Sequence, residues 1–318
     1  MSNQRVIPII VPYPTGLKTV NFYLVQREKH LTLIDAGFND DACWRALNEA
    51  LQELNLDLKD ITEIILTHHH IDHVGLVNRI IDIHPIPIFA SPLSVPRLRR
   101  DKDFLELRME YFSRLYREMG CGENGDKQIS YLRKSIEKNK DSAIRGKITV
   151  ISEECLLNYR VIDVPGHAPD QLAFLDEANN WIFAGDLLIE HISSNALVEP
   201  DDYGKRIPSL IQHVHSLKKL HSLHVDIVYS GHGSIIHKPN EIIEMRLKRT
   251  KEKLDKIQML IKSGNRTGSE LAQTMYRGKY EKEFSLVMSE IIGHLDYLEH
   301  ENRIEKEFVN GVCYYYSK

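Results

Sequence analysis

The sequence has few cysteines, no long apolar run and no strong excess of charge of either sign. None of its apolar runs approaches the roughly 20 residues that span a bilayer. Residues 1–5 are polar and residues 6–11 are short and interrupted by proline, so neither segment resembles a signal peptide. The four cysteines are scattered without a C-x-x-C pair, which is typical of reduced thiols. These absences predict a cytoplasmic protein that is not bound to a membrane.

The overall composition indicates a globular protein with a sizeable core. Hydrophobic residues make up 42% and charged residues 27% of the chain, as in ordinary globular domains. A length of 318 residues is more than one ordinary domain needs. The net charge of −4 gives no global reason to expect a nucleic acid or a membrane surface as the partner.

The most informative stretch follows a mostly apolar, strand-like run at 61–66. Within six positions come His68, His69, His70, Asp72 and His73. Imidazole and carboxylate groups are ligands for zinc and other first-row divalent ions. A coincidental polar loop or a surface histidine cluster is the alternative, but the spacing His-x-His-x-Asp-His is narrower than a bare His-rich tract. The stretch therefore predicts a metal site.

This stretch resembles the signature of the metallo-β-lactamase superfamily, specifically its two-metal hydrolase branch. The resemblance requires further ligands at the ends of later strands, in a set order. Three candidates fit that order: His167 in Pro-Gly-His, Asp186 after Gly185, and His232 in Gly-His-Gly. Each follows an apolar run and lies beside a small residue, which lets the backbone turn tightly.

The resemblance also assigns the metals and their ligands. His68, His70 and His167 would hold one ion, Asp72, His73 and His232 the other, and Asp186 would bridge them with one oxygen to each. The implied cofactor is two Zn²⁺ per chain, and sites of nitrogen and oxygen ligands also accept Mn²⁺ or Fe²⁺. Asp35, in Asp-Ala-Gly, resembles the first motif of the superfamily and would support the metal loop without binding a metal. The other interpretation of Asp35 is a plain strand-to-turn aspartate.

The implied activity is hydrolysis. Two cations about 3.5–4 Å apart can share a hydroxide at neutral pH, which would attack an ester, thioester, lactone or related electrophile. Asp72 would orient the nucleophile and pass on a proton. His70 favours hydrolysis, because redox di-iron relatives usually carry glutamate at its position. His69, His191 and His237 match no ligand position, so we expect them in supporting or surface roles.

Two other functions stay open. An endoribonuclease or phosphodiesterase acting on single-stranded RNA gains support from the Arg-rich segment at 97–100. A non-catalytic, metal-bound regulatory protein is the third interpretation, although a purely structural site needs only one ion. Glyoxalase II-like hydrolysis of a thioester needs a basic pocket for glutathione, and no residues of this sequence match such a pocket.

The order of strand and helix patterns predicts an α/β fold. With the resemblance, residues 1–238 are expected to form an αββα sandwich. The predicted strands are 6–11, 19–25, 31–34, 61–66, 163–167, 172–175, 181–186 and 227–230, and the predicted helices start after Asp40 and span 206–223.

Between about residues 92 and 147 the pattern becomes helical, with a break at 120–125 and a second helix from near Gln128. This is too long for a simple connection, so we predict a helical insertion. It would form a substrate-selecting lid over the active-site mouth, carrying Tyr111, Tyr116 and nearby arginines. A helix pair that merely packs on the sheet, with its basic residues solvated, fits the pattern equally well.

Residues 239–318 predict a separate small domain. A long helix at 241–262, a capping box in Thr267–Glu270, an apolar helical pattern at 284–298 and a hairpin with an Asn310-Gly311 turn look like a winged helix. Attached to this hydrolase core, it resembles the cytosolic endoribonuclease-like and glyoxalase II-like branch. The candidate recognition helix and its flanks carry six acidic residues: Glu281, Glu283, Glu290, Asp296, Glu299 and Glu301.

These charges guide the expected partners, because phosphate attraction needs positive charge. We expect the C-terminal domain to serve packing or dimerisation, with a homodimer as one outcome, and not sequence-specific DNA binding. A small-molecule substrate fits the chain better than RNA does, and no membrane partner is expected.

Overall fold

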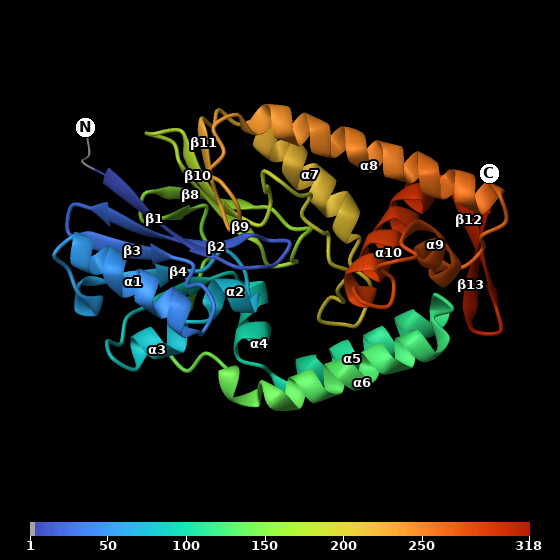
Figure 1. The fold of residues 1–318 in the computed structure, drawn as a ribbon, viewed down its shortest axis with the longest axis horizontal. Helices are drawn as coiled ribbons and strands as arrows, with labels where there is room; N and C mark the ends of the chain where they lie inside the picture. Colours follow the sequence, from blue (N-terminus) through green and yellow to red (C-terminus); the bar gives the residue numbers. More distant parts are fainter. Residues whose placement is uncertain (1–3) are drawn as a thin grey trace.

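The computed structural model describes residues 4–318, and at its centre two β-sheets pack face to face (Figure 1). The first sheet has the order β1-β2-β3-β4-β5-β6 and the second the order β11-β10-β9-β8-β7. The strands of the first sheet are β1 (Gln4–Pro12), β2 (Thr19–Arg27), β3 (His30–Ile34), β4 (Glu63–Ile65), β5 (Ile88–Ala90) and β6 (Ile148–Val150). The strands of the second are β7 (Cys155–Leu156), β8 (Tyr159–Asp163), β9 (Leu172–Asp176), β10 (Trp181–Gly185) and β11 (Ile227–Ser230).

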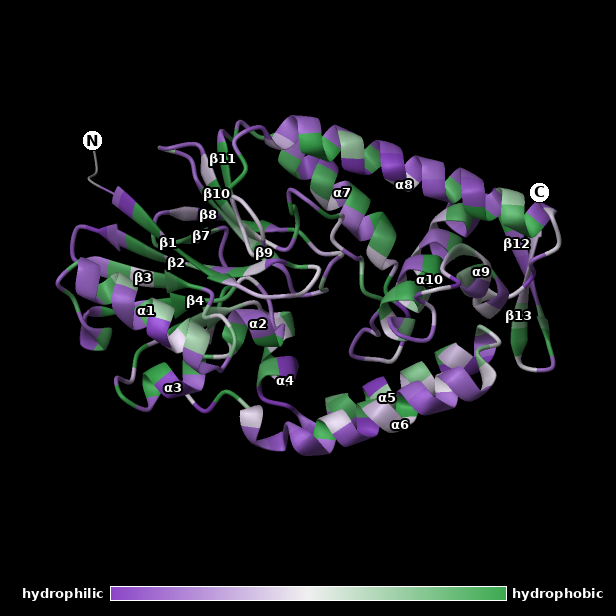
Figure 2. Ribbon diagram, viewed as in Figure 1, coloured by the Kyte–Doolittle hydropathy of each residue, from purple (hydrophilic) through white to green (hydrophobic). Residues whose placement is uncertain are grey.

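Helices cover the outer face of each sheet. The helices α1 (Asp41–Glu53) and α3 (Val77–Ile81) pack on the first sheet, and α7 (Ser209–His221) packs on the second. Between the sheets lies an aromatic core in which Phe183 and Tyr229 stack at 4.8 Å between ring centroids. The hydrophobic residues are concentrated in the strands, whereas hydrophilic residues recur along the outer helices (Figure 2). This order of layers is the predicted αββα sandwich, and the prediction is confirmed.

Parallel pairing brings four loops to one edge of the sandwich. In the first sheet β3 runs parallel to β4, with Ile34 opposite Ile65. In the second sheet β10 runs parallel to β11, with Gly185 opposite Ser230. Because parallel strands end at the same edge, the segments that follow these strands lie next to one another.

Three predicted boundaries are wrong by a few residues. β8 ends at Asp163, where the predicted strand 163–167 begins, because Pro165 has no N–H to donate and Gly166 has a φ of +137°. β4 begins two residues later and ends one residue earlier than the predicted 61–66. The helix expected over 206–223 begins only after Pro208.

The insertion between β5 and β6 is helical, as predicted. It contains α4 (Val95–Leu98), α5 (Lys102–Glu118) and α6 (Gly122–Lys138). The break between α5 and α6 covers only residues 119–121, not 120–125, because Gly120 and Gly122 turn the chain sharply with φ of +72° and +52°.

The C-terminal part has the predicted succession of helices and hairpin. Its elements are α8 (Pro239–Lys262), α9 (Gly268–Met275), α10 (Phe284–His300), β12 (Ile304–Val309) and β13 (Val312–Ser317). The capping box is confirmed: the Thr267 hydroxyl accepts from the Glu270 N–H at 3.2 Å, and the Glu270 carboxylate accepts from the Thr267 N–H at 3.0 Å. Asn310 and Gly311 both have positive φ, as the predicted type I′ turn requires. The winged-helix comparison itself stays a prediction.

The insertion and the C-terminal helices share one apolar core. Tyr111, Leu115 and Tyr116 of α5 belong to the same buried cluster as Ile257 of α8 and Leu295 of α10. These elements lie in the part of the molecule away from the two sheets (Figure 1). Tyr111 and Tyr116 are only 3% and 4% exposed, so the expectation that they face the substrate is wrong. Neither does the helix pair merely pack on the sheet. Its apolar face is covered by residues that come more than 100 positions later.

The cysteines and the helices can be compared with what the composition predicted. Cys43, Cys121, Cys155 and Cys313 are all free thiols, and only Cys155 is exposed. Among residues 4–318, no helix is both long and apolar enough to cross a membrane.

Candidate metal centre

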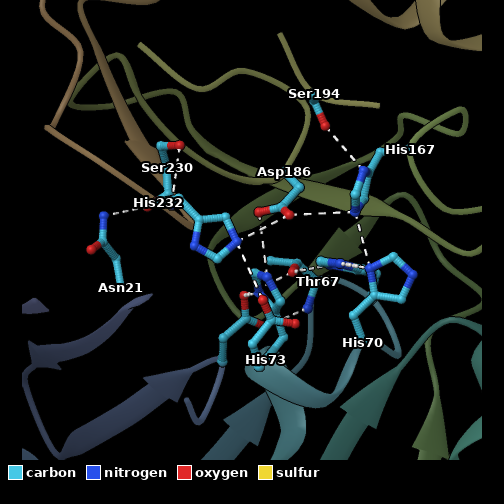
Figure 3. Close-up of polar contacts among 12 residues, drawn as sticks. Asn21, Thr67, His70, His73, His167, Asp186, Ser194, Ser230 and His232 are labelled. Atoms are coloured by element: carbon cyan, nitrogen blue, oxygen red, sulfur yellow. Dashed lines mark hydrogen bonds and ion pairs between the residues drawn. The ribbon is translucent and has the colours of Figure 1, made fainter. Parts of the chain in front are cut away.

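The predicted ligands meet where the two sheets end (Figure 3). The loop after β4 carries His68 and His70, and the short helix α2 (Ile71–Val74) carries Asp72 and His73. The loops after the second sheet's strands carry the other three: His167, Asp186 and His232. Three overlapping groups of these side chains have ligand atoms within 4.8 Å of one another. The structure thus brings all seven predicted ligands together.

Three imidazole nitrogens converge in the first group. The Nδ1 atom of His70 lies 2.9 Å from Nε2 of His68 and 3.0 Å from Nε2 of His167. A neutral imidazole has one nitrogen that donates and one that accepts, so three such atoms cannot satisfy one another. Their other nitrogens are held separately, His68 Nδ1 by the Thr67 hydroxyl at 3.0 Å and His167 Nδ1 by the Asn195 carbonyl at 2.9 Å. Ligand nitrogens oriented in this way are typical of metal-binding histidines.

The second group consists of Asp72, His73 and His232. The Oδ2 atom of Asp72 lies 3.4 Å from Nε2 of His232. The ring nitrogens that point away from the centre are again hydrogen-bonded. Nδ1 of His73 contacts the Asp35 carboxylate at 2.7 Å, and Nδ1 of His232 contacts the Thr19 carbonyl at 2.7 Å. This leaves the Nε2 atom of both rings facing the centre.

Asp186 lies between the two groups (Figure 3). Its Oδ2 atom is 3.3 Å from Nε2 of His167 and 3.2 Å from Nε2 of His232, and its Oδ1 atom is 3.3 Å from Nε2 of His73. Both carboxylate oxygens of Asp186 therefore face ligand nitrogens, and the predicted bridge between two metals stays a prediction. The Asp186 carboxylate can lie here because residue 231 is a glycine. A Cβ atom on residue 231 would lie 2.4 Å from Asp186 Oδ1.

Three atoms at this centre test whether a metal fits. Nε2 of His73, Nε2 of His232 and Oδ1 of Asp186 are buried and make no hydrogen bond within the described chain. Buried polar atoms are nearly always satisfied, since leaving one unpaired costs about 1–3 kcal/mol. Two divalent cations would satisfy all of them with the ligand types these ions prefer. The residues therefore fit a dinuclear metal centre.

Burial keeps two of the histidines in the metal-binding form. It holds the pKa of His68 well below its ordinary value, and the nearby ring of His73 acts in the same direction. The pKa of His70 is also well below its ordinary value because of burial and the ring of His69. Both rings are thus neutral at pH 7 and offer a nitrogen lone pair.

Around the Asp186 carboxylate, charge interactions outweigh the effect of burial on the pKa values. Burial alone would lower the pKa of His73, but the carboxylates of Asp186 and Asp35 raise it well above its ordinary value. Burial alone would raise the pKa of Asp186, but the rings of His232 and His73 hold it well below its ordinary value. A bound cation would replace the proton that these carboxylates attract, since metal binding releases protons from its ligands.

Asp35 and Thr67 support the metal loop from below. The Asp35 carboxylate accepts from the Thr67 N–H and the Thr67 hydroxyl, both at 2.8 Å, in addition to its contact with His73. Its own backbone is left-handed, with a φ of +58°. Thr67, which sequence reasoning missed, in turn contacts Gly185, where a Cβ atom would lie 2.7 Å from the threonine hydroxyl. Both sheets therefore meet at this threonine.

A second buried carboxylate was also missed. Asp170 is 1% exposed and contacts Nδ1 of His69 at 2.7 Å, while Ser94 donates its hydroxyl to it at 2.6 Å. Burial would raise the pKa of Asp170, but His69 lowers it to about 2. Its place three positions after His167 is the one sequence signal that pointed to it. His191, by contrast, contacts the Gly16 carbonyl at 3.0 Å, and His237 is exposed, so neither joins the ligand groups.

A pocket of about 360 Å³ opens beside the ligands. One wall comes from the metal loop and α2, with His69, His70, Ile71 and Asp72. The insertion also lines the pocket, with Arg97, Arg100, Phe104 and Arg108. The start of the insertion therefore borders the site, whereas the rest of it packs on the C-terminal helices.

Comparisons with known proteins agree with this geometry. The family model described as "Metallo-beta-lactamase superfamily" matches residues 15–232 of the chain. The chain is 31% identical to the probable metallo-hydrolase YqjP of Bacillus subtilis (strain 168), over 99% of this chain and 98% of that protein. It is 26% identical to the hydroxyacylglutathione hydrolase GloC of Haemophilus influenzae, over 65% of this chain and 82% of that protein. The crystal structure of a metallo-beta-lactamase family protein from Thermus thermophilus, TTHA1429, superposes with a TM-score of 0.80 at 25% identity, covering 98% of both chains.

Proposed function

We propose that this chain, which belongs to the metallo-beta-lactamase superfamily and is a metallo-hydrolase, hydrolyses small acyl esters and thioesters. The pocket beside His70 and Asp72 carries this proposal. Its volume of about 360 Å³ suits a small molecule, and its wall includes the apolar side chains of Ile71, Leu98 and Phe104. The similarity to a hydroxyacylglutathione hydrolase supports an acyl substrate.

We expect zinc at the centre, with two ions per chain. Nitrogen and oxygen ligands of this kind also accept manganese or iron. When bound, the ions would polarise the substrate carbonyl and lower the pKa of water toward 7.

Asp72 is the residue that we expect to handle the proton. Its carboxylate lies beside His232 and also lines the pocket, so it faces the ligands and the substrate together. From this position it can orient the attacking water, accept its proton, and return that proton to the departing thiol or alcohol. His68 is held by the Thr67 hydroxyl and His167 by the Asn195 carbonyl, and His70 contacts both of these rings, so the three do not depend on Asp72.

The RNA alternative has less support. A strand of RNA needs an extended basic surface, whereas this chain has a net charge of −4 and a small pocket. In the C-terminal part, α10 is largely buried against α7, α8 and α9, so it has little surface to offer a nucleic acid. We infer that this part serves packing.

The test is a substrate panel on protein loaded with zinc or with manganese. The panel contains a short acyl thioester, a lactone, a bis-aryl phosphodiester and a single-stranded RNA oligonucleotide. We expect the thioester to have the highest kcat/KM and to lose turnover in Asp72→Asn. Arg117→Met is the control, because Arg117 is exposed on α5. Cleavage of RNA or the phosphodiester with no acyl hydrolysis would overturn the proposal.

A further inference from the structure

Three arginine side chains line the pocket beside the metal ligands: Arg97, Arg100 and Arg108. We propose that they bind an anionic group of the substrate, a carboxylate or a phosphate. This inference rests on the proposed acyl hydrolysis and narrows its substrate to acyl compounds that carry a negative charge.

Only one carboxylate is shared among the three arginines. Glu199 is 6% exposed and accepts from Nε of Arg108 at 3.0 and 2.8 Å. Nη2 of Arg97 lies 4.0 Å from the same carboxylate. Although burial would raise the pKa of Glu199, Arg108 lowers it, so this carboxylate is ionised. The cluster therefore keeps an excess of positive charge at the wall of the pocket.

Arg100 is the arginine without a counterion. Within residues 4–318 it forms no ion pair, and its Nη2 donates only to the Ile136 carbonyl at 3.3 Å. Its Nε atom is buried without a hydrogen-bond partner, as is Nε of Arg97. A half-buried cation and unpaired N–H groups are costly unless an anion pairs with them. A guanidinium offers planar, paired donors that match carboxylate and phosphate oxygens.

The location of this charge favours the substrate as the source of the anion. The same pocket contains His70 and Asp72, so a group bound by the arginines belongs to a molecule that also reaches the metal ligands. Ile71, the first residue of α2, also lines this pocket and is 68% exposed although it is apolar. A molecule with an apolar acyl chain and an anionic end would cover both features.

Three thioesters with one butyryl group provide the test. Their thiols are N-acetylcysteamine, which is neutral, 3-mercaptopropionate, which carries a carboxylate, and phosphopantetheine, which carries a phosphate. We expect the metal-loaded enzyme to have a lower KM for at least one anionic thioester than for the neutral one. Arg100→Met should raise the KM of that thioester about 10- to 100-fold, the usual effect of losing a charged hydrogen bond. The effect on the neutral thioester should be several-fold smaller.

Two further variants separate charge from structure. Arg100→Lys should recover part of the lost selectivity because it keeps the charge. Arg117→Met removes an exposed arginine of α5 outside the pocket and should leave the selectivity unchanged. Arg97 and Arg108 are less suitable targets, since both are counterions of the buried Glu199 and removing either would leave that carboxylate less well paired.

Calorimetric binding of the matching butyl thioethers, which cannot be hydrolysed, separates this inference from the proposed function. If no thioester is cleaved but an anionic thioether binds more tightly than the neutral one, and Arg100→Met removes the difference, the proposed function fails and anion binding stands. If thioesters are cleaved with equal KM whatever their charge, or if Arg100→Met affects all three equally, anion binding is overturned. Preference for the carboxylate or for the phosphate identifies the anion.

Discussion

Replacing Asp186 with alanine tests the metal centre most directly, because this carboxylate touches both groups of ligands. Its Oδ2 atom lies within 3.3 Å of a histidine in each group, and Oδ1 lies 3.3 Å from His73. Even residues that only orient a ligand change metal affinity by about 10- to 100-fold when they are replaced. Loss of a shared ligand should therefore weaken both ions by at least about 100-fold.

The assay is elemental analysis after dialysis against a zinc buffer of fixed free concentration. Wild-type protein should keep two ions per chain where Asp186→Ala keeps fewer than one. His191→Ala is the matched control, since His191 belongs to none of the ligand groups and its ring hydrogen-bonds to the Gly16 carbonyl and packs against Gly233, so this variant should retain both ions. Metal binding also stabilises the fold, by about 2.7 kcal/mol at 100 times Kd, so zinc should raise the Tm of the wild type more than that of Asp186→Ala. Two tightly bound ions in Asp186→Ala would refute the bridging role.

Three further outcomes follow from the structure. Asp72→Asn should keep the ion held by His68, His70 and His167 but lose about 10²–10⁴-fold in kcat, with His191→Ala far milder; near-normal turnover in the Asn variant would remove Asp72 from proton transfer. Deleting residues 239–318 should expose the apolar face of α5, which shares a core with α8 and α10; a monomeric truncated protein with unchanged Tm would contradict this. Asp170 has a pKa of about 2, lowered from its unfolded value, so its stabilisation is present above pH 4 and lost as the pH falls through 2. The difference in unfolding free energy between wild type and Asp170→Asn should therefore narrow by about 1 kcal/mol between pH 5 and pH 3 in urea titrations, and a constant difference would contradict the shift.

Local patterns in the sequence were sufficient for the α/β class and the ligand loop, and the resemblance to the superfamily supplied the αββα order of layers. The spacing of His68, His70, Asp72 and His73 is contained within one short segment. The capping box at Thr267 and the Asn310-Gly311 turn are likewise interactions between neighbours in the chain. Such features are predictable because their hydrogen bonds and φ preferences involve residues that are close together in the sequence. Even so, the starts of β4 and α7 were predicted two and three residues too early.

Only the tertiary structure decided what surrounds the ligands. Arg108 and Glu199 are 91 positions apart, and His69 and Asp170 are 101 apart, so no periodicity links either pair. The burial of Tyr111 likewise depends on α8 and α10, which follow more than 100 residues later. An amphipathic pattern shows that a helix has an apolar face but not which element covers it. Residues that are adjacent in the sequence determine the local backbone structure. Packing between distant segments determines which charges remain unpaired in the pocket.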